Sequence, residues 1–214
     1  MSTAPFSIPT PQFAPVIGEP VWDMALLYPL QGGWTEENYL EVAFARNWLI
    51  EFTDGCVEVL PMPTIEHQII VRFLLDVLRA FVDPKKLGMV LFAPLPVKLG
   101  VKGYREPDII FNFTQNHIER SKKYYDRADL VMEVVSDDKR SHTRDYDEKR
   151  ADYAKAGILE YWIVDPQEQR VTVLALEGGE YVEHASLQGA GAAPSKLLDG
   201  FTIDVAAVFA AGKS

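Results

Sequence analysis

The sequence predicts an α/β fold in which helices flank one mixed central sheet. Helical and β-prone segments alternate in the order helix, hairpin, long helix, strands, helix, strand and hairpin. A continuous apolar stripe runs along the predicted long helix over 65–82, which gives that helix a face to bury against a sheet. Two strongly β-prone runs, 107–111 and 129–136, supply the strands on which that sheet would be built.

Composition fits one globular domain. The chain has 214 residues, of which 48% are hydrophobic and 24% charged, as expected for one core with some peripheral decoration. We predict a single domain over 21–214. The segment 1–20 contains five prolines and no periodic pattern, which predicts an extended or disordered N-terminal arm.

Charge and cysteine content limit the possible functions. The formal net charge of −10 argues mildly against non-specific nucleic-acid binding, which depends on Lys and Arg neutralising phosphates. The single cysteine, Cys56, excludes an intrachain disulfide or a thiolate metal cluster. The longest apolar run is far too short for a membrane span and no signal-peptide pattern is visible. We therefore expect a cytoplasmic protein without a membrane partner.

The N-terminal half contains clear helix and turn signals. Thr35 and Asn38 resemble a capping box that opens a short helix ending near residue 46. Asp54-Gly55 lies between two β-prone runs and predicts a hairpin. Thr64 can cap the long helix over 65–82, and Asp83-Pro84 should end it. One or two strands with prolines at an edge or bend follow in 88–99.

The C-terminal half also contains alternating helix and strand signals. We expect a helix capped by Thr143 and terminated by Gly157, followed by a strand at 161–165. Residues 169–184 should form a hairpin that turns at Gly178-Gly179. A loop over 189–194 and a strand-and-helix segment over 197–211 would close the domain.

Two acidic residues stand in these β-prone runs. Glu133 is surrounded by five large apolar residues, and Asp108 opens an apolar run after Pro107. Burying a lone carboxylate is unfavourable, so such a group normally has a partner, a proton or a metal. The alternatives are a turn hydrogen bond for Asp108 and an arginine salt bridge for Glu133. If the two strands are neighbours, these acids would form a small divalent-metal site.

Lys149 is the third candidate. Tyr146, Lys149 and Tyr153 are spaced to lie on one face of the predicted helix. The tyrosines should face the sheet, so Lys149 would point inward towards the two acids. The alternative is a lysine whose stem packs on the protein while its ammonium remains in water.

Other polar residues could assist. His67 and Glu66 lie in the first turn of the long helix, where Glu66 also has a structural reason to be, because it interacts favourably with the helix dipole. Glu51 lies inside a predicted strand and could add a carboxylate. The chain lacks a nucleophile elbow, a phosphate-binding glycine loop and a dinucleotide fingerprint.

Over about 35–210 the chain resembles the restriction endonuclease-like family of the PD-(D/E)XK nuclease superfamily. The resemblance rests on Glu51-Phe-Thr-Asp-Gly55, the helix start around His67, Glu106-Pro-Asp108, Asp129 to Ser136 and the distinctive run from Asp145 to Asp165. It implies a restriction-endonuclease-like fold with the site at one edge of the sheet. Asp108 and Glu133 would fill the first and second acidic positions of the superfamily.

The chain departs from the superfamily pattern at one position. Val135 stands where a lysine is expected, and the resemblance implies that Lys149 replaces it from the following helix. Asp108 and Glu133, with the carbonyl of Val134, would hold Mg²⁺ or Mn²⁺, which prefer oxygen ligands. The implied reaction is phosphodiester hydrolysis, with DNA as the expected substrate and His67 or Glu66 assisting.

Two other functions fit the same residues. One is a catalytically weak or inactive nuclease-fold protein that acts as a binding or regulatory partner, which the acidic net charge and Val135 favour. The other is a carboxylate-based metalloenzyme acting on a small phosphorylated substrate. We also expect a homodimer, since nucleases that cut both strands are often two-fold symmetric.

Overall fold

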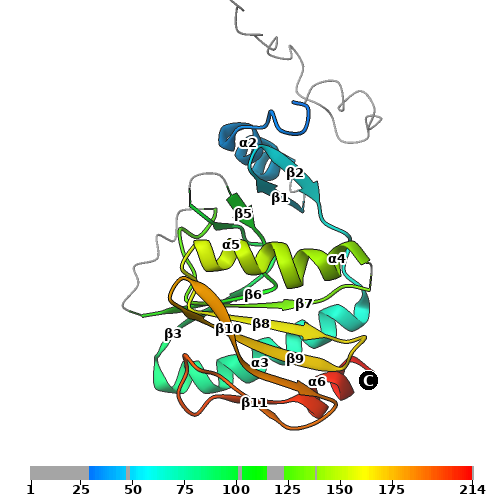
Figure 1. Ribbon diagram of the computed structural model, residues 1–214, viewed down its shortest axis with the longest axis vertical. Coiled ribbons are helices and arrows are strands. Elements are labelled where there is room, and N and C mark those ends of the chain that lie inside the picture. The colour runs from blue at the N-terminus through cyan, green and yellow to red at the C-terminus, as the bar shows by residue number, and fades with distance from the viewer. Residues whose placement is uncertain (1–28, 47–48, 101–102, 115–122, 138, 214) are drawn as a thin grey trace, which may run out of the picture.

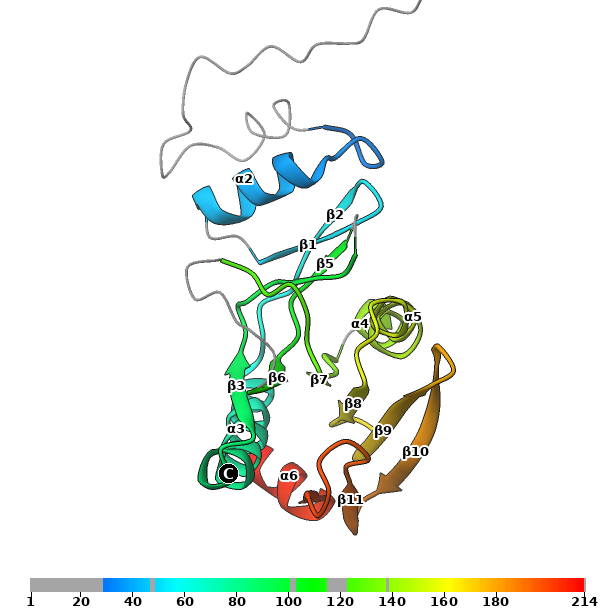
Figure 2. The same cartoon turned by 90° about the vertical axis from the view of Figure 1, so that its left-hand side faces the viewer.

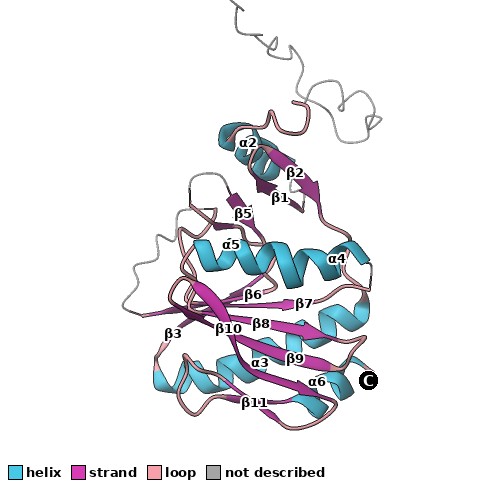
Figure 3. Ribbon diagram, in the orientation of Figure 1, coloured by secondary structure: helices cyan, strands magenta, loops and turns pink. Residues whose placement is uncertain are grey.

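The computed structural model describes residues 29–46, 49–100, 103–114, 123–137 and 139–213. Within these ranges the chain forms an α/β structure (Figure 1; Figure 3). The predicted N-terminal arm, 1–20, lies outside the described residues. None of the helices in the described ranges is both long enough and apolar enough to cross a bilayer.

The larger sheet has six strands in the order β10-β9-β8-β7-β6-β3. These strands are β3 (Gly88–Phe92), β6 (Ile109–Phe113), β7 (Leu130–Val134), β8 (Glu160–Asp165), β9 (Arg170–Glu177) and β10 (Glu180–Gln188). β7 and β8 run parallel, whereas the other neighbours are antiparallel. The predicted mixed central sheet is confirmed.

The N-terminal hairpin belongs to a second sheet, which the sequence did not predict. This sheet has the order β2-β1-β5-β4 and contains β1 (Ile50–Thr53), β2 (Cys56–Val59), β4 (Val97–Lys98) and β5 (Gly103–Arg105). The hairpin turn is at Asp54-Gly55 as predicted, and both residues have the positive φ angles, 47° and 83°, that such a turn requires. Helix α2 (Glu36–Arg46) packs on this sheet through a separate apolar cluster that includes Tyr39 and Phe52.

Helices cover both faces of the larger sheet (Figure 2). Helices α3 (Ile65–Lys85) and α6 (Val205–Gly212) lie on one face. On the other face, α4 (Lys139–Thr143), a π-helical turn η1 (Arg144–Glu148) and α5 (Lys149–Lys155) form one continuous helical segment. The apolar stripe of α3 is buried through Ile70, Leu74 and Leu78, as expected. The central strands β6, β7 and β8 are therefore almost entirely buried, including β7, which carries Glu133.

Three local predictions were wrong. Helix α3 does not end at Asp83-Pro84 but runs to Lys85, because a proline in the last turn removes only one hydrogen bond and a left-handed Lys86 caps the helix. Thr143 is not a helix cap, since its backbone is helical and its side chain makes no capping bond. The expected loop over 189–194 contains β11 (Ala192–Pro194), which pairs with β12 (Thr202–Asp204).

Candidate active site

The two acids predicted from the strands come from neighbouring elements and line one pocket. Asp108 directly precedes β6, and its Oδ2 accepts a hydrogen bond of 2.7 Å from the backbone N–H of Val134 at the end of β7. Glu133, one residue earlier on β7, is 3% exposed. Sheet pairing therefore brings together two side chains that are 25 positions apart in the sequence. The pocket has a volume of about 360 Å³, and its charged or titratable lining residues are His67, Glu106, Asp108, Glu133, Arg144, Asp145 and Lys149.

Lys149 points inward, as the helical spacing predicts. Its side chain is 4% exposed, and its Nζ lies 2.9 Å from Glu133 Oε1, 3.2 Å from Asp145 Oδ1 and 3.6 Å from Glu51 Oε1. The alternative of a lysine with its ammonium in water is therefore excluded. Glu133 pairs with this lysine instead of the arginine considered above, and it also accepts a hydrogen bond from the hydroxyl of Tyr153.

The π-helical turn helps to position these groups. It contains Asp145 and ends immediately before Lys149. The hydroxyl of Tyr161, on β8, donates a 2.8 Å hydrogen bond to the carbonyl oxygen of Asp145, and this contact helps to hold the widened turn. Single π-turns inside helices occur frequently at functional sites. Asp145 and Lys149 are both buried beside this turn.

The buried charges change one another's pKa. Burial alone would lower the pKa of Lys149, but the surrounding acids, Asp145 first among them, raise it, so this lysine stays protonated. Burial raises the pKa of Glu133, and the negative charge of Asp108 acts in the same direction, whereas Lys149 opposes both. A bound cation would favour the ionised form of Glu133 in the same way as Lys149 does.

His67 contacts Asp108 from the first turn of α3. Its Nε2 lies 3.3 Å from Asp108 Oδ2, and Thr64, the cap of α3, accepts its backbone N–H. Burial would lower the pKa of His67, but Asp108 raises it above the ordinary value. Among the described residues no group hydrogen-bonds its Nδ1, which is buried. The imidazole is therefore held in place by one acid.

Glu66 is not brought into this pocket. It is exposed and lines a neighbouring depression together with His67. The aliphatic part of its side chain lies against Gly212 at the end of α6. The two residues are adjacent on a helix and so point about 100° apart, which explains why only His67 reaches Asp108.

Sequence reasoning missed two carboxylates in the pocket. Asp145 precedes Lys149 by four residues, a spacing that pairs side chains on a helix and could have revealed it. Glu106 lies two residues before Asp108, is 7% exposed and, among the described residues, has no hydrogen-bond partner for its buried Oε2. Burial, assisted by the charge of Glu51, raises the pKa of Glu106 to about 8. An unpaired buried acid oxygen of this kind is unusual and often has a functional explanation.

Glu51 links the site to neighbouring elements through buried hydrogen bonds. Arg105 Nη1 donates to its Oε2 at 2.7 Å, and the backbone N–H of Glu106 donates to its Oε1 at 3.0 Å. Arg105 also donates to Asp152 on α5. This buried network joins β1, β5 and α5 and so fixes the second sheet against the helix that carries Lys149.

The network predicts how stability depends on pH. Burial would raise the pKa of Glu51, but Lys149 and Arg105 outweigh it and hold the pKa at about 2. Because the pKa of Glu51 is lower in the folded state, its ionised form stabilises the protein at pH values above its ordinary pKa of 4.5. This contribution is lost as the pH falls from 4.5 towards 2. We expect Glu51→Gln to be less stable than the parent by about 2 kcal/mol at pH 7. Urea unfolding at pH 7, 4 and 3 should show this deficit shrinking at acid pH, and a constant deficit would contradict the assignment.

The side chains of the pocket are of the type that binds a divalent cation, although no three of its acids and histidine have ligand atoms that all lie within 4.8 Å of one another in this structure. Asp108, Glu133 and Glu106 offer carboxylate oxygens, the ligands that Mg²⁺ and Mn²⁺ prefer. The unpartnered Oε2 of Glu106 is a donor that the protein's own hydrogen bonds leave unused. The ammonium of Lys149 lies among Glu133, Asp145 and Glu51, whereas Asp108 contacts His67 and the backbone N–H of Val134.

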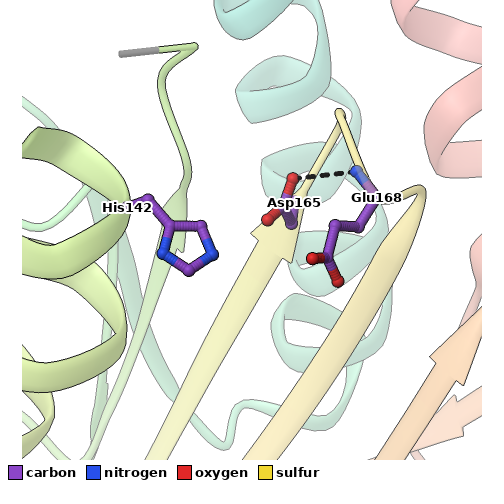
Figure 4. A group of neighbouring side chains, drawn as sticks. All are labelled: His142, Asp165 and Glu168. Atoms are coloured by element: carbon purple, nitrogen blue, oxygen red, sulfur yellow. Dashed lines mark hydrogen bonds between the residues drawn. The ribbon is translucent and has the colours of Figure 1, made fainter. Parts of the chain in front are cut away.

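A second group of possible ligands lies outside this pocket. Potential ligand atoms of His142, Asp165 and Glu168 all lie within 4.8 Å of one another, the one such group of three within the described part of the chain (Figure 4). The oxygens of Asp165 already accept hydrogen bonds from the backbone of Gln167 and Glu168 and from Tyr146. Glu168 also accepts from Arg170. These contacts give the group a structural role in holding the β8–β9 turn.

Comparisons with known proteins identify a family and a similar fold. A family model described as Uma2, putative restriction endonuclease, matches residues 36–206. No curated protein matches the chain. A crystal structure of a putative nuclease belonging to DUF820 from Anabaena variabilis is similar in fold, with a TM-score of 0.67 and 17% sequence identity over 86% of this chain and 99% of that chain.

Proposed function

Because the chain belongs to the Uma2 family, described as putative restriction endonuclease, we propose that it is a metal-dependent endonuclease that hydrolyses phosphodiester bonds in DNA. The observation that carries this proposal is the meeting of Asp108, Glu133 and Lys149 in one pocket. Two acids and an amine from three different elements reproduce the donor set expected of such a nuclease. The restriction-endonuclease-like fold itself is supported by the similar crystal structure.

Asp108 and Glu133, with Glu106 and the carbonyl of Val134, would hold Mg²⁺ or Mn²⁺. The ion would supply positive charge beside the scissile phosphate and make water a stronger nucleophile at neutral pH. Both carboxylates that would bind the ion are held in place by contacts within the protein. The N–H of Val134 fixes the Asp108 carboxylate, and Tyr153 and Lys149 fix that of Glu133.

Lys149 and His67 act on the substrate from two sides. The ammonium of Lys149 remains protonated because three acids surround it, so it offers a fixed positive charge for the negative charge that develops on the phosphate. His67, held by Asp108, can orient the attacking water or donate a proton to the leaving oxygen. Both groups are buried, which strengthens their electrostatic effect on a bound phosphate.

The rival function is a catalytically weak or inactive nuclease-fold protein that serves as a binding or regulatory partner. One observation favours it, namely that Glu133, Asp145 and Glu51 already neutralise Lys149. A homodimeric assembly and a cytoplasmic location also remain predictions.

A metal titration on nucleic acid substrates tests the proposal. We expect the purified full-length protein to nick or linearise plasmid DNA with Mg²⁺ or Mn²⁺ and to lose this activity in excess EDTA. RNA and small phosphate esters, offered in parallel, should be poorer substrates. Cleavage that persists in EDTA would contradict the proposed mechanism, whereas tight Mn²⁺ binding without cleavage of any substrate would establish the rival.

A further inference from the structure

Arg144 lines the pocket but is weakly paired with acids there. It lies in the π-helical turn η1, and its side chain is 6% exposed. Nη1 lies 3.5 Å from Glu58 Oε1, and Nε lies 3.6 Å from Asp145 Oδ1. Hydrogen bonds from N–H to oxygen usually measure about 2.7–3.2 Å. The shortest contact of the guanidinium with the described residues, 2.8 Å, is to the uncharged hydroxyl of Ser141.

Arg105 shows how this protein pairs a buried arginine that holds elements together. Its side chain is 4% exposed, and it donates to Glu51 and to Asp152 at 2.7 Å each. Arg144 is buried to a similar degree, but its Nε–H has no hydrogen-bond acceptor within the described ranges. A buried charged donor without an acceptor is unfavourable and usually has an explanation. An anion in the pocket would offer the guanidinium the short, charge-assisted bonds that it does not make with the acids.

Glu58 does not depend on Arg144 for a counterion. Its two carboxylate oxygens also accept hydrogen bonds of 3.3 and 3.2 Å from Nε and Nη2 of Arg140. Arg144 can therefore exchange Glu58 for another anion without leaving that carboxylate unpaired. Burial alone would lower the pKa of Arg144, but Asp145 and the other nearby acids raise it above the ordinary value. The guanidinium is therefore charged whichever anion it contacts.

A phosphodiester is the anion that best suits this guanidinium. The planar group can donate two parallel N–H bonds to two phosphate oxygens, which an ammonium cannot do. Four carboxylates line the same pocket, and a cation beside the proposed metal would offset their repulsion of a phosphate. Three of the protein's acids lie close to Lys149, which leaves Arg144 as the more weakly paired of these two cations.

We propose that Arg144 binds a phosphate of the DNA substrate in the pocket, exchanging its long contact with Glu58 for two short bonds to phosphate oxygens. This inference rests on the proposed nuclease function and adds a substrate-binding residue to it. Arg144 holds the substrate, whereas the chemical step is left to Lys149 and His67.

DNA binding measured apart from cleavage tests this assignment. Fluorescence anisotropy of the full-length protein, with Ca²⁺ in place of Mg²⁺, would follow a short labelled duplex over a range of KCl concentrations. We expect Arg144→Gln to weaken binding at least about tenfold, as for the loss of charge-assisted hydrogen bonds. The slope of log Kd against log [KCl] should fall by about 1, because one phosphate fewer is neutralised. Arg144→Lys keeps the charge without the paired N–H groups, so it should keep the slope and bind with intermediate affinity.

Arg140→Gln is the matched control. Arg140 contacts the same Glu58 but lines a different depression of the surface. This variant should keep both the DNA affinity and the salt dependence of the parent. Mn²⁺ affinity, measured by titration calorimetry without DNA, should not fall in any of the three variants, because neither arginine is a metal ligand.

The outcomes separate this inference from the proposed function. Metal-dependent cleavage by the parent, with unchanged DNA affinity and salt slope in Arg144→Gln, would overturn the role of Arg144 and leave the nuclease intact. An equal loss of binding in Arg140→Gln, or a parallel loss of Mn²⁺ affinity in Arg144→Gln, would also overturn it. If Arg144→Gln does not fold, parent-like affinity in Arg144→Lys would contradict the paired bonds. A parent protein that neither binds nor cleaves DNA would count against the nuclease function itself, and the role of Arg144 would fall with it.

Discussion

Asp108→Asn is expected to reduce metal-dependent cleavage at least about 100-fold while leaving the fold intact. The substitution preserves the size of the side chain, and the amide oxygen can still accept the N–H of Val134. What is lost is the negative charge of one of the two acids proposed to hold the metal. His67 also loses the charge that holds its Nε2. Exchanging one oxygen for nitrogen therefore weakens a proposed metal ligand and also weakens the contact that orients the imidazole.

Cleavage rates and Mn²⁺ affinity, measured by titration calorimetry on both proteins, check this expectation. Glu168→Gln is the matched control, because it makes the same acid-to-amide change in the other group of possible ligands. It should change neither the rate nor the affinity at the pocket. Full activity in Asp108→Asn, or loss of activity only in Glu168→Gln, would place the chemistry elsewhere in the molecule.

Lys149→Met is expected to affect both stability and activity. The lysine is the shared partner of Glu133, Asp145 and Glu51. Removing it leaves buried carboxylates without a cation, which costs about 3–5 kcal/mol and should lower the melting temperature by roughly 10 °C for a domain of this size. The loss should be smaller at pH 5 than at pH 8, because protonation of the unpaired acids relieves the repulsion.

Thermal unfolding at several pH values, alongside cleavage assays, measures both effects. Lys155→Met, at the exposed end of the same helix, should change stability by less than about 0.5 kcal/mol. The double variant Lys149→Met/Glu133→Gln should recover part of the stability and none of the activity. A single variant as stable as the parent at pH 8 would mean that the three acids do not depend on this ammonium.

Much of the fold follows from local signals. The turns at Asp54-Gly55 and Gly178-Gly179 need residues that accept positive φ, and the structure has such angles at both. The apolar stripe of α3 likewise predicted that this helix packs on a sheet. The placement of the hairpin in a second sheet was not predictable, because it depends on the pairing of β1 with β5, about 50 residues later in the chain.

The candidate site, too, was predictable from the sequence only in part. Glu133 and Asp108 could be predicted because an acid in an apolar strand needs a partner. Lys149 could be predicted because the tyrosines on its helix defined the face that it shares. Glu106 was not visible, because its importance comes from an oxygen left unpaired by the tertiary structure. The π-helical turn was also hidden, since a hydroxyl on β8 helps to hold it.

Crystals grown with Mn²⁺ offer the most direct test of the account, because the anomalous signal of manganese locates the ion independently of activity. We predict an anomalous peak in the pocket, within coordination distance of Asp108 and Glu133, that is lost in Asp108→Asn. A peak found only among His142, Asp165 and Glu168, or no peak at saturating Mn²⁺, would contradict the assignment of this pocket as the metal site of a nuclease.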